Sequence, residues 1–432
     1  MKAVSKPLRI AIAGLGTVGA GTFSILTSKS QLLQKRAGKS IEVAAVSARS
    51  KAKKRNVKLN KTKWVNDALS LASMKEVDVV VELIGGASGV AYELCKTALK
   101  NKKSVVTANK AMIAAHGLEL ATLAEKNGVK LLCEAAVAGG IPLLKSIREG
   151  LAGNTISRVA GILNGTCNYI LTAMDEEKRS FDDVLKEAQK LGYAEADPSF
   201  DIDGIDASHK LSILTALAFG CPVNMKAMSV EGITKITLSD IAYAGELGYK
   251  IRLLGITEQT KHGILQRVHP AMIPLSSPIS RVRGVLNAAT ISTDSLGNLF
   301  LEGAGAGAGP TASAVVADIV DIAAGRGTNT FNIPASELKA GKFTDIKHRT
   351  GAYYLRLTVA DKAGVLSAIT KVLSKEKISV ETLLQPAAQG GKRAEIIIIT
   401  HTTTEAAMEK ALHKMRKMAH IVEQPQRIRI EA

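Results

Sequence analysis

The stretch that decides the fold is LRIAIAGLGTVGAGTFSIL, Leu8–Leu26. Its first six residues, Leu8–Ala13, predict a short buried strand, and the apolar residues after the glycines predict a helix. Between them, Gly14, Gly16 and Gly19 form the pattern G-x-G-x-x-G. The pattern alone is weak, but between a first strand and a helix it indicates a dinucleotide-binding turn, where the backbone approaches a pyrophosphate at the helix N-terminus. A glycine turn without a ligand is the weaker interpretation.

The segments after this turn continue the alternation of strands and helices. Ile41–Ser50 and Val77–Gly86 predict further strands, and two strand-then-loop units lead to Thr107–Lys110 and Glu134–Gly140. Apolar strands that alternate with helices indicate a parallel, doubly wound sheet of the Rossmann type. Ligands of such sheets bind beyond the carboxyl ends of the strands, which is where the last two segments fall.

The end of the second strand bears on the choice of cofactor. An NAD-preferring site usually has an acidic residue there to bind the ribose hydroxyls, whereas this chain continues with SARSK, residues 47–51. The guanidinium of Arg49 suits the 2′-phosphate of NADP. A solvated basic loop is the alternative. The sequence therefore predicts that NADP(H) is preferred over NAD(H).

Beyond the first domain, residues 1–140, the pattern changes. Residues 141–303 mix strands with longer helices and predict an α+β domain for substrate binding, catalysis and dimerisation. Residues 304–335 begin AGAGAGPTASAV, a second glycine-rich loop that opens onto an apolar helix, and we expect them to return to the nucleotide-binding domain. After a linker over 336–352, the order βαββαβ over 353–432 predicts a ferredoxin-like sandwich.

The composition excludes several classes of protein. No apolar run is long enough to cross a bilayer, and the first residues lack a signal-peptide core. Four widely separated cysteines argue against a zinc site or a disulfide framework and favour a cytoplasmic setting. The formal net charge is +18 at pH 7, but the basic run at 51–63 has no interleaved aromatic residues. We therefore expect small anions as partners, and neither nucleic acid nor a membrane.

Against this basic background, GYAEADPSFDIDGIDASHKL, Gly192–Leu211, concentrates acidic residues. A calcium loop fails, because alignment on Gly204 puts Lys210 where the twelfth position needs a glutamate. A solvated acidic face is a second interpretation, with Asp206 and Lys210 as a surface i, i+4 pair. The third is a site for a cationic substrate group. The helix from Ile205 continues with apolar residues, so its first turn lies at the edge of a core, where a lysine beside carboxylates is a reasonable catalytic pair.

Taken together, the motifs resemble those of one enzyme family. GLGTVG, TANKAMIA, EAAVAGGIP, GILNGTCNYIL, LGYAEADPSFDIDGIDASHKL and GAGAGPTASAV follow one another over residues 8–325 in the order of monofunctional homoserine dehydrogenase. The long acidic motif is the most specific of them. The tail, DKAGVLSAITKVLSKEKISVETLLQ, resembles an ACT domain, the amino-acid-sensing module that often ends this family. No aspartokinase-like segment precedes the nucleotide fold, so we expect the monofunctional form.

The resemblance implies a reaction. L-Aspartate 4-semialdehyde would be reduced by a nicotinamide cofactor to L-homoserine, in the aspartate-derived pathway to threonine, methionine and isoleucine. Two other functions stay open at this point. One is a phosphorylating semialdehyde dehydrogenase that uses Cys167, although no local base is evident and a buried structural cysteine explains this residue better. The other is a non-catalytic amino-acid sensor, against which the set Lys110, Asp206 and Lys210 speaks.

The same resemblance implies roles for particular residues. Lys210 resembles the proton donor, which stabilises and protonates the substrate oxygen as it becomes alkoxide-like, and Lys110 supports the cofactor and the substrate. Asp206 joins them as a catalytic residue. The expected substrate-binding residues are Glu195, Asp201 and Asp206. The expected cofactor-binding residues are Gly14, Gly16, Thr17, Val18, Gly19, Arg49, Lys110, Gly192 and Gly309. A monovalent cation such as sodium is expected, mostly through backbone carbonyls, at Glu134, Val137, Gly139 and Ile141.

The C-terminal module is expected to regulate the enzyme. DKAG, Asp361–Gly364, forms the loop-to-helix turn where ACT modules bind amino acids, and threonine is the expected effector because it is an end product of the pathway. Pairing of such modules between chains would favour a homodimer or homotetramer. We expect the module to be separable, so that a chain ending near His348 keeps its activity and loses feedback inhibition.

Overall fold

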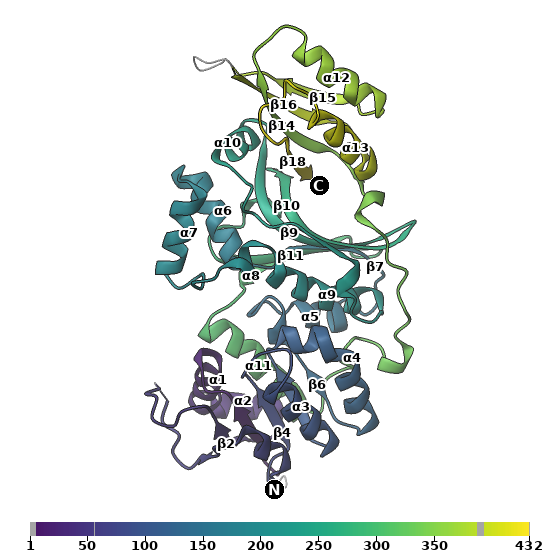
Figure 1. Cartoon of the computed structure of the whole chain (residues 1–432). Helices are drawn as coiled ribbons and strands as arrows, with labels where there is room; N and C mark the ends of the chain where they lie inside the picture. The colour runs from purple at the N-terminus through teal and green to yellow at the C-terminus, as the bar shows by residue number, and fades with distance from the viewer. Residues whose placement is uncertain (1–5, 56, 387–392, 432) are drawn as a thin grey trace. The chain divides into compact units, whose positions relative to one another are not determined.

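A computed structural model describes residues 6–55, 57–386 and 393–431, and Figure 1 traces the chain. Two compact units emerge. One contains the described residues up to Gly165 together with Asp206–Lys226 and Val285–Gly341, and the other contains Thr166–Ile205, Ala227–Gly284 and the described residues from Lys342 onwards. None of the helices among the described residues is long and apolar enough to cross a membrane.

The first unit is built on a six-stranded parallel sheet with the order β3-β2-β1-β4-β5-β6. Its strands are β1 (Leu8–Ala13), β2 (Ile41–Ser47), β3 (Lys63–Trp64), β4 (Val79–Glu82), β5 (Ser104–Thr107) and β6 (Leu131–Leu132). The Rossmann-type sheet predicted from the glycine motif is confirmed. β2 ends at Ser47, before the predicted end at Ser50, and Arg49 and Ser50 beyond it are exposed.

Helices cover this sheet and build its core. The helices of the parallel sheet are α1 (Thr17–Ser28), α2 (Ser30–Ala37), α3 (Val90–Lys100), α4 (Lys110–Lys126) and α11 (Ala308–Ala323). α1 and α11 share one apolar core with β1, in which Phe23 and Ile319 pack with Ile10 and Ile12. The two helices approach so closely that a Cβ on Gly21 would lie 2.6 Å from the carbonyl oxygen of Ala308. α11, although late in the chain, therefore lies against the helix that follows the glycine turn.

The first unit also contains an antiparallel set of strands and a long buried helix. Strand β11 (Leu286–Thr293) pairs with β12 (Asn298–Ala304) on one side and with β7 (Ile156–Ile162) on the other. The helix α9 (Ile205–Phe219) begins where the sequence predicted it, and most of its residues are buried. The short elements of this unit are η1 (Ala68–Ser73), η2 (Glu134–Ala136), α5 (Leu143–Lys145), η3 (Ser146–Gly150), η4 (Met225–Ala227) and η6 (Ala335–Glu337).

The second unit combines helices with a mixed sheet. In this sheet β9 (Tyr249–Thr260) and β10 (Gly263–Pro274) form a long antiparallel hairpin, and β8 (Met228–Val230) runs parallel to β10. The helices are α6 (Gly165–Glu177), α7 (Phe181–Lys190), α8 (Ser199–Ile202) and α10 (Leu238–Glu246). The remaining short elements are η5 (Pro278–Arg281), η7 (Ile346–His348), β13 (Thr350–Gly351) and β17 (Thr403–Thr404).

The last part of the second unit is the predicted βαββαβ module, drawn in light green to yellow in Figure 1. Its elements are β14 (Tyr353–Ala360), α12 (Val365–Lys375), β15 (Val380–Leu384), β16 (Arg393–Thr400), α13 (Glu405–Met415) and β18 (Gln426–Ile430). The two helices pack on one face of the strands around an apolar core that includes Leu357, Ile369, Ile398 and Met408. The predicted ferredoxin-like fold is confirmed.

The prediction that this module is separable needs correction. β18 continues the sheet of the second unit, because it runs parallel to β10, with Ala271 opposite Arg429. Buried ion pairs cross the same boundary. The Arg267 guanidinium, 2% exposed, lies 3.0 Å from the Glu431 carboxylate. Because removal of one partner from a buried pair leaves an uncompensated charge, a chain cut near His348 would be destabilised.

Candidate active site

The glycine turn after β1 has the geometry that a dinucleotide requires. Gly14 has φ +98°, and a Cβ there would lie 2.4 Å from the Leu83 carbonyl oxygen. A Cβ on Gly19 would lie 1.9 Å from the Gly14 carbonyl oxygen, so α1 can approach the turn only without a side chain. Around Gly16, in contrast, a Cβ would meet no atom within 4 Å. The backbone at Gly16 is therefore open to a ligand, as a pyrophosphate site needs.

The other predicted cofactor residues in the first unit lie near this turn or on α11. Thr17 and Val18 open α1 with N–H groups that lack intrahelical partners, which are the donors that bind phosphate at a helix start. Gly309 is in the first turn of α11, the helix that packs against α1. Arg49 is exposed just after β2.

Sequence reasoning missed Arg55. Its Nε donates to the Leu15 carbonyl in the glycine turn at 3.0 Å, and its guanidinium also donates to the Ser50 carbonyl at 2.7 Å. The same group lies over the Trp64 ring, 5.5 Å from its centroid. Arg55 thus fixes the loop after Arg49 against the turn. Its place in the basic run 51–63 was the only signal, and that run does not distinguish it from its neighbours.

The carboxyl ends of β4 and β5 are fixed by a buried carboxylate. Glu82, fully buried, accepts hydrogen bonds from the Thr107 hydroxyl at 2.6 Å and from the N–H of Gly85 at 2.9 Å. Next to Thr107, the Asn109 side chain caps the start of α4 by accepting from the Met112 N–H at 3.1 Å. Together these contacts determine where α4 begins, and Lys110 is its first residue.

Lys110, Asp206 and Lys210, predicted as one catalytic set, come together in the first unit. Lys110 Nζ lies 2.9 Å from Asp206 Oδ1, and Lys210 Nζ donates to Asp206 Oδ2 at 2.6 Å. Lys210 also donates to the carbonyl of Leu163 at 2.7 Å, and the Asn164 side-chain amide donates to Asp206 Oδ2 at 2.8 Å. Sequence reasoning did not single out Leu163 and Asn164, although both stand in the motif GILNGTCNYIL.

The electrostatics of this group favour a charged carboxylate between two ammonium groups. Asp206 is 4% exposed. Burial acts to raise the pKa of Asp206, but the ammonium groups of Lys210 and Lys110 outweigh it and hold this pKa well below its usual value. Burial, with the nearby Lys110 ammonium, also lowers the pKa of His209 on the next position of α9. One carboxylate and two ammonium groups leave the cluster with a positive charge.

Hydrogen-bond counting suggests what this cluster can do. An ammonium group has three donors, and Lys210 uses two of them, on Asp206 and on the Leu163 carbonyl. A third donor is thus left for an acceptor such as a substrate carbonyl oxygen. Because the Lys210 side chain is only 13% exposed, its charge acts on that oxygen with little screening by water. The cluster can therefore stabilise negative charge on an oxygen and supply a proton to it.

The remaining predicted substrate and cofactor residues lie in the second unit. Gly192, with φ +77°, follows α7, and Glu195 is exposed nearby, its carbonyl accepting from the Gln189 amide at 3.1 Å. Asp201 is half-buried in α8. The fully buried Cys167 donates from Sγ to the Asp201 carbonyl at 3.2 Å, which fits a structural cysteine.

The predicted cation residues form a tight, buried loop after β6. Glu134 is 1% exposed, and its carboxylate accepts the N–H groups of Leu144 at 3.0 Å and Lys145 at 2.9 Å. Burial, together with the neighbouring Asp318 carboxylate, raises the pKa of Glu134 to about 8. Its carboxylate oxygens are thus already used to hold the start of the helix α5, and a cation here would depend on backbone carbonyls.

Two of those carbonyls suit a cation. Val137 and Gly139 are buried, and within the described part of the chain no backbone or side-chain donor reaches either carbonyl oxygen. The Ile141 carbonyl, in contrast, accepts the Leu143 N–H at 2.7 Å. Oxygen ligands of this kind are what a hard cation prefers. The described residues contain no cluster of three or more His, Cys, Asp or Glu side chains able to hold a metal ion.

Comparison with known proteins identifies the family. Residues 14–134 match the family described as "Homoserine dehydrogenase, NAD binding domain", residues 142–320 match "Homoserine dehydrogenase", and residues 353–419 match "ACT domain". The homoserine dehydrogenases of Neisseria gonorrhoeae and Pseudomonas aeruginosa are 45% and 44% identical to the chain, with 99% of each chain covered in both cases. The chain belongs to the homoserine dehydrogenase family.

Solved structures agree with this assignment. A homoserine dehydrogenase from Thiobacillus denitrificans is 42% identical, with a TM-score of 0.92, and the match covers 99% of this chain and 98% of that one. A hyperthermophilic archaeal homoserine dehydrogenase, solved in complex with NADPH, is 30% identical, with a TM-score of 0.65, over 75% of this chain and 100% of its own.

The family decides between the functions that the sequence left open. The protein is an NAD(P)-dependent oxidoreductase that acts on a CH–OH group, and its reaction is the reduction of L-aspartate 4-semialdehyde to L-homoserine. Neither a phosphorylating dehydrogenase that uses Cys167 nor a non-catalytic sensor is supported. The C-terminal ACT domain is consistent with an amino-acid effector.

Proposed function

We propose that Lys210 is the proton donor of this homoserine dehydrogenase and that Lys110 and Asp206 complete its catalytic group. The observation that carries the proposal is the Lys110–Asp206–Lys210 cluster, in which one buried carboxylate orients two ammonium groups. When bound, the nicotinamide supplies the hydride. As the carbonyl carbon is reduced, Lys210 stabilises the negative charge on the oxygen and then protonates it. Lys110 adds positive charge from the start of α4.

For the substrate's ammonium group, the proposal keeps the carboxylates Glu195, Asp201 and Asp206. Glu195 is exposed, whereas Asp206 already has two lysine partners and an amide donor. A substrate that carries an ammonium group explains why a strongly basic protein concentrates acid in this stretch.

The cofactor proposal is NADP(H) in preference to NAD(H). Gly14, Gly16, Thr17, Val18, Gly19, Arg49, Lys110, Gly192 and Gly309 remain the proposed contacts. The open backbone at Gly16 supports the pyrophosphate position. Arg49, exposed beyond β2 and followed by the loop that Arg55 ties to the glycine turn, supports binding of the 2′-phosphate.

Sodium, the effector and the assembly also stay proposals. The buried carbonyls of Val137 and Gly139 support a monovalent cation in the loop from Glu134 to Ile141. The cation proposal is tested by melting temperature at constant ionic strength, which should rise with sodium and does not depend on an activity assay. Threonine is the proposed effector at the turn Asp361–Gly364. We also keep the homodimer or homotetramer and the domain boundaries predicted from the sequence as proposals.

A comparison of two aspartate substitutions tests the catalytic proposal. Asp206→Asn keeps the shape of the side chain but removes the charge between the lysines, whereas Asp203→Asn removes an exposed carboxylate from the same stretch. Oxidation of NADPH with aspartate semialdehyde is followed by absorbance. We expect kcat/KM to fall by about 10²-fold or more in Asp206→Asn and to change little in Asp203→Asn. Equal activity in both variants would remove Asp206 from the mechanism.

A further inference from the structure

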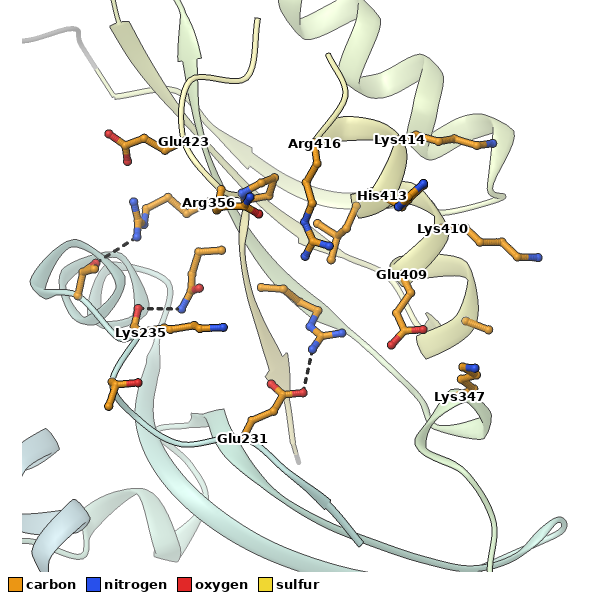
Figure 2. A pocket seen from close by; sticks show the side chains of 18 residues that line it. Glu231, Lys235, Lys347, Arg356, Glu409, Lys410, His413, Lys414, Arg416 and Glu423 are labelled. Carbon is orange, nitrogen blue, oxygen red and sulfur yellow. Dashed lines mark hydrogen bonds and ion pairs between the residues drawn. The ribbon is translucent and has the colours of Figure 1, made fainter. Parts of the chain in front are cut away.

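The second unit contains a large polar hollow that the catalytic proposal does not use. Its volume is about 1130 Å³, and it lies between α13, the segment that leads into β18, and the loop of residues 231–237 that follows β8. Figure 2 shows its lining side chains, which are mostly charged. The hollow is larger than most small-molecule sites, which measure roughly 300–1,000 Å³. It can therefore accept a metabolite of nucleotide size.

Two arginines of the lining are already neutralised. Arg427 forms ion pairs with Glu405, which is fully buried, and with Glu231 at 3.0 Å. Arg356 lies 2.7 Å from the buried carboxylate of Asp240. These pairs fix the base of the hollow and add little net charge to it.

Other cations of the lining have no such partner. Lys235 and Arg416 point into the hollow from different sides in Figure 2, one from the 231–237 loop and one from the end of α13. Within the described residues, neither side chain forms an ion pair, and the same is true of Lys347 and Lys410 at the rim. Glu409 is the one lining carboxylate, among those described, that extends into the hollow without an ion pair. The uncompensated charge is therefore positive.

We propose that this hollow is a binding site for a small organic polyanion, a metabolite that carries two or more phosphate or carboxylate charges. Arg416 provides a planar fork for one anionic group, and Lys235 provides a point charge across the hollow from it. An anion with a single charge leaves one of them without a partner. The hydroxyl of Thr234 is a further donor on the loop side, whereas the Thr237 hydroxyl already donates to Asp240.

The loop side of the hollow leads to the acidic stretch within the same unit. The Ile233 N–H donates to the Ile202 carbonyl at 2.8 Å, and a Cβ on Gly232 would lie 2.2 Å from that same oxygen. The loop that carries Lys235 thus packs directly on the end of α8, which carries Asp201. A ligand that draws Lys235 towards Arg416 alters this contact. If Asp201 binds substrate as proposed above, occupancy of the hollow changes the KM for the semialdehyde.

Isothermal titration calorimetry on the full-length protein tests the site directly. The probes are inorganic pyrophosphate and citrate, added at constant ionic strength with the cofactor site saturated by NADPH, so that pyrophosphate does not bind at the glycine turn. Lys235→Glu and Arg416→Glu should each weaken binding about tenfold or more. Lys371→Glu makes the same charge change at an exposed position of α12 outside the hollow and should leave binding intact.

Each outcome of the titrations either supports the site or overturns it. Binding of either probe that is lost in both hollow variants and kept in Lys371→Glu supports the site, and the preferred probe tells phosphate from carboxylate. Absence of binding to the wild-type protein, or equal binding in all variants, overturns the proposal. Because calorimetry needs no turnover, the binding result remains valid even if the proposed roles of Lys210 and Asp201 are wrong. If the KM for the semialdehyde changes when the probe is added, the result supports coupling between the hollow and α8. If the probe binds and the KM does not change, there is no such coupling.

Discussion

Lys110 Nζ lies 2.9 Å from Asp206 Oδ1, and this ion pair joins the first residue of α4 to the first turn of α9. α4 follows a strand of the nucleotide-binding sheet, so the pair connects the cofactor fold to the helix that carries Lys210. Asp206 is 4% exposed, and its charged carboxylate holds both ammonium groups at hydrogen-bonding distance. An arrangement of this kind is expensive to bury unless each charge is paired, which makes it sensitive to the loss of any member.

Replacement of Lys210 by alanine should lower kcat by about 10²–10⁴-fold, because general acid catalysis typically contributes that much. The cofactor is proposed to bind mainly at the glycine turn and Lys110, so the KM for NADPH should change little. Steady-state kinetics with both substrates varied measures the two effects. A melting temperature that stays well above the assay temperature must accompany the loss, because removal of one member of the buried cluster lowers stability even where the variant stays folded.

Lys210→Arg provides the matched control for charge. A guanidinium keeps the positive charge beside Asp206 but hardly releases a proton, so this variant should stay slow. If Lys210 were only half of a helix salt bridge, Lys210→Ala would lose a few tenths of a kcal/mol of stability and retain its turnover. Near-normal kcat would leave Lys110 as the only candidate acid.

Much of this site could be predicted from local sequence, for reasons that the structure makes clear. The glycine pattern works at short range, since Gly14 and Gly19 meet backbone atoms that would exclude any side chain. The spacing of Asp206 and Lys210 on one helix is also a local property, and the ion pair between them is present. The roles of these residues remain predictions.

Contacts between segments that are distant in the sequence could not be predicted. Asn164 and Leu163 reach the cluster only because β7 and α9 come together in the folded unit, and no periodicity reports this. Nothing in the sequence distinguishes Arg55 from the other basic residues of the run 51–63. The ACT module was predicted as separable because its strand and helix pattern is complete in itself, whereas the β18–β10 pairing and the Arg267–Glu431 ion pair depend on tertiary structure.

Replacement of Arg49 by glutamate should move the cofactor preference towards NADH. A charge-assisted contact from the guanidinium to the 2′-phosphate is worth about 1.5–3 kcal/mol, and a carboxylate would repel this phosphate. The ratio of kcat/KM for NADPH to that for NADH measures the change. Lys51→Glu, an equal charge change at an exposed neighbour, serves as the control. Wild-type kcat/KM that is equal or better with NADH would contradict the assignment.

Asp361→Ala should weaken inhibition by threonine while leaving the uninhibited activity close to normal. Asp361 stands in the turn before α12, where Gly364 has φ +88°, a conformation that favours glycine. Loss of hydrogen bonds to a charged ligand predicts an inhibition constant about tenfold higher or more. Glu381→Ala removes an exposed carboxylate from β15 of the same module and should leave inhibition unchanged. A wild-type enzyme that ignores threonine and every other amino acid of the pathway would remove the sensing role.

The buried His269 should make the stability of the protein depend on pH. It is 1% exposed, its Nε2 lies 3.4 Å from the Glu431 carboxylate, and its Nδ1 lies 3.0 Å from the Pro270 carbonyl oxygen. Burial, aided by the nearby Arg429 guanidinium, lowers the pKa of His269 to about 4, against about 6.5 for a histidine in an unfolded chain. Between these values the unfolded chain binds a proton that the folded chain does not.

The contribution of His269 to the free energy of unfolding should therefore be largest above pH 6.5 and fall as the pH decreases towards 4. The raised pKa of Glu134 acts in the opposite direction, but equally in every variant compared below. Between pH 7 and pH 5 the expected loss from His269 is about 2 kcal/mol. The nearby Glu431 contributes little in this range, because a glutamate in the unfolded chain titrates at about 4.3 and the Arg267 partner holds the pKa of Glu431 lower still in the folded state, against the effect of burial. Urea unfolding of wild type, His269→Gln and the exposed His413→Gln at pH 7, 6 and 5 measures the slopes. Compared with wild type, only His269→Gln should lose less stability between pH 7 and pH 5, and a pH dependence identical to wild type in that variant would assign it to other groups.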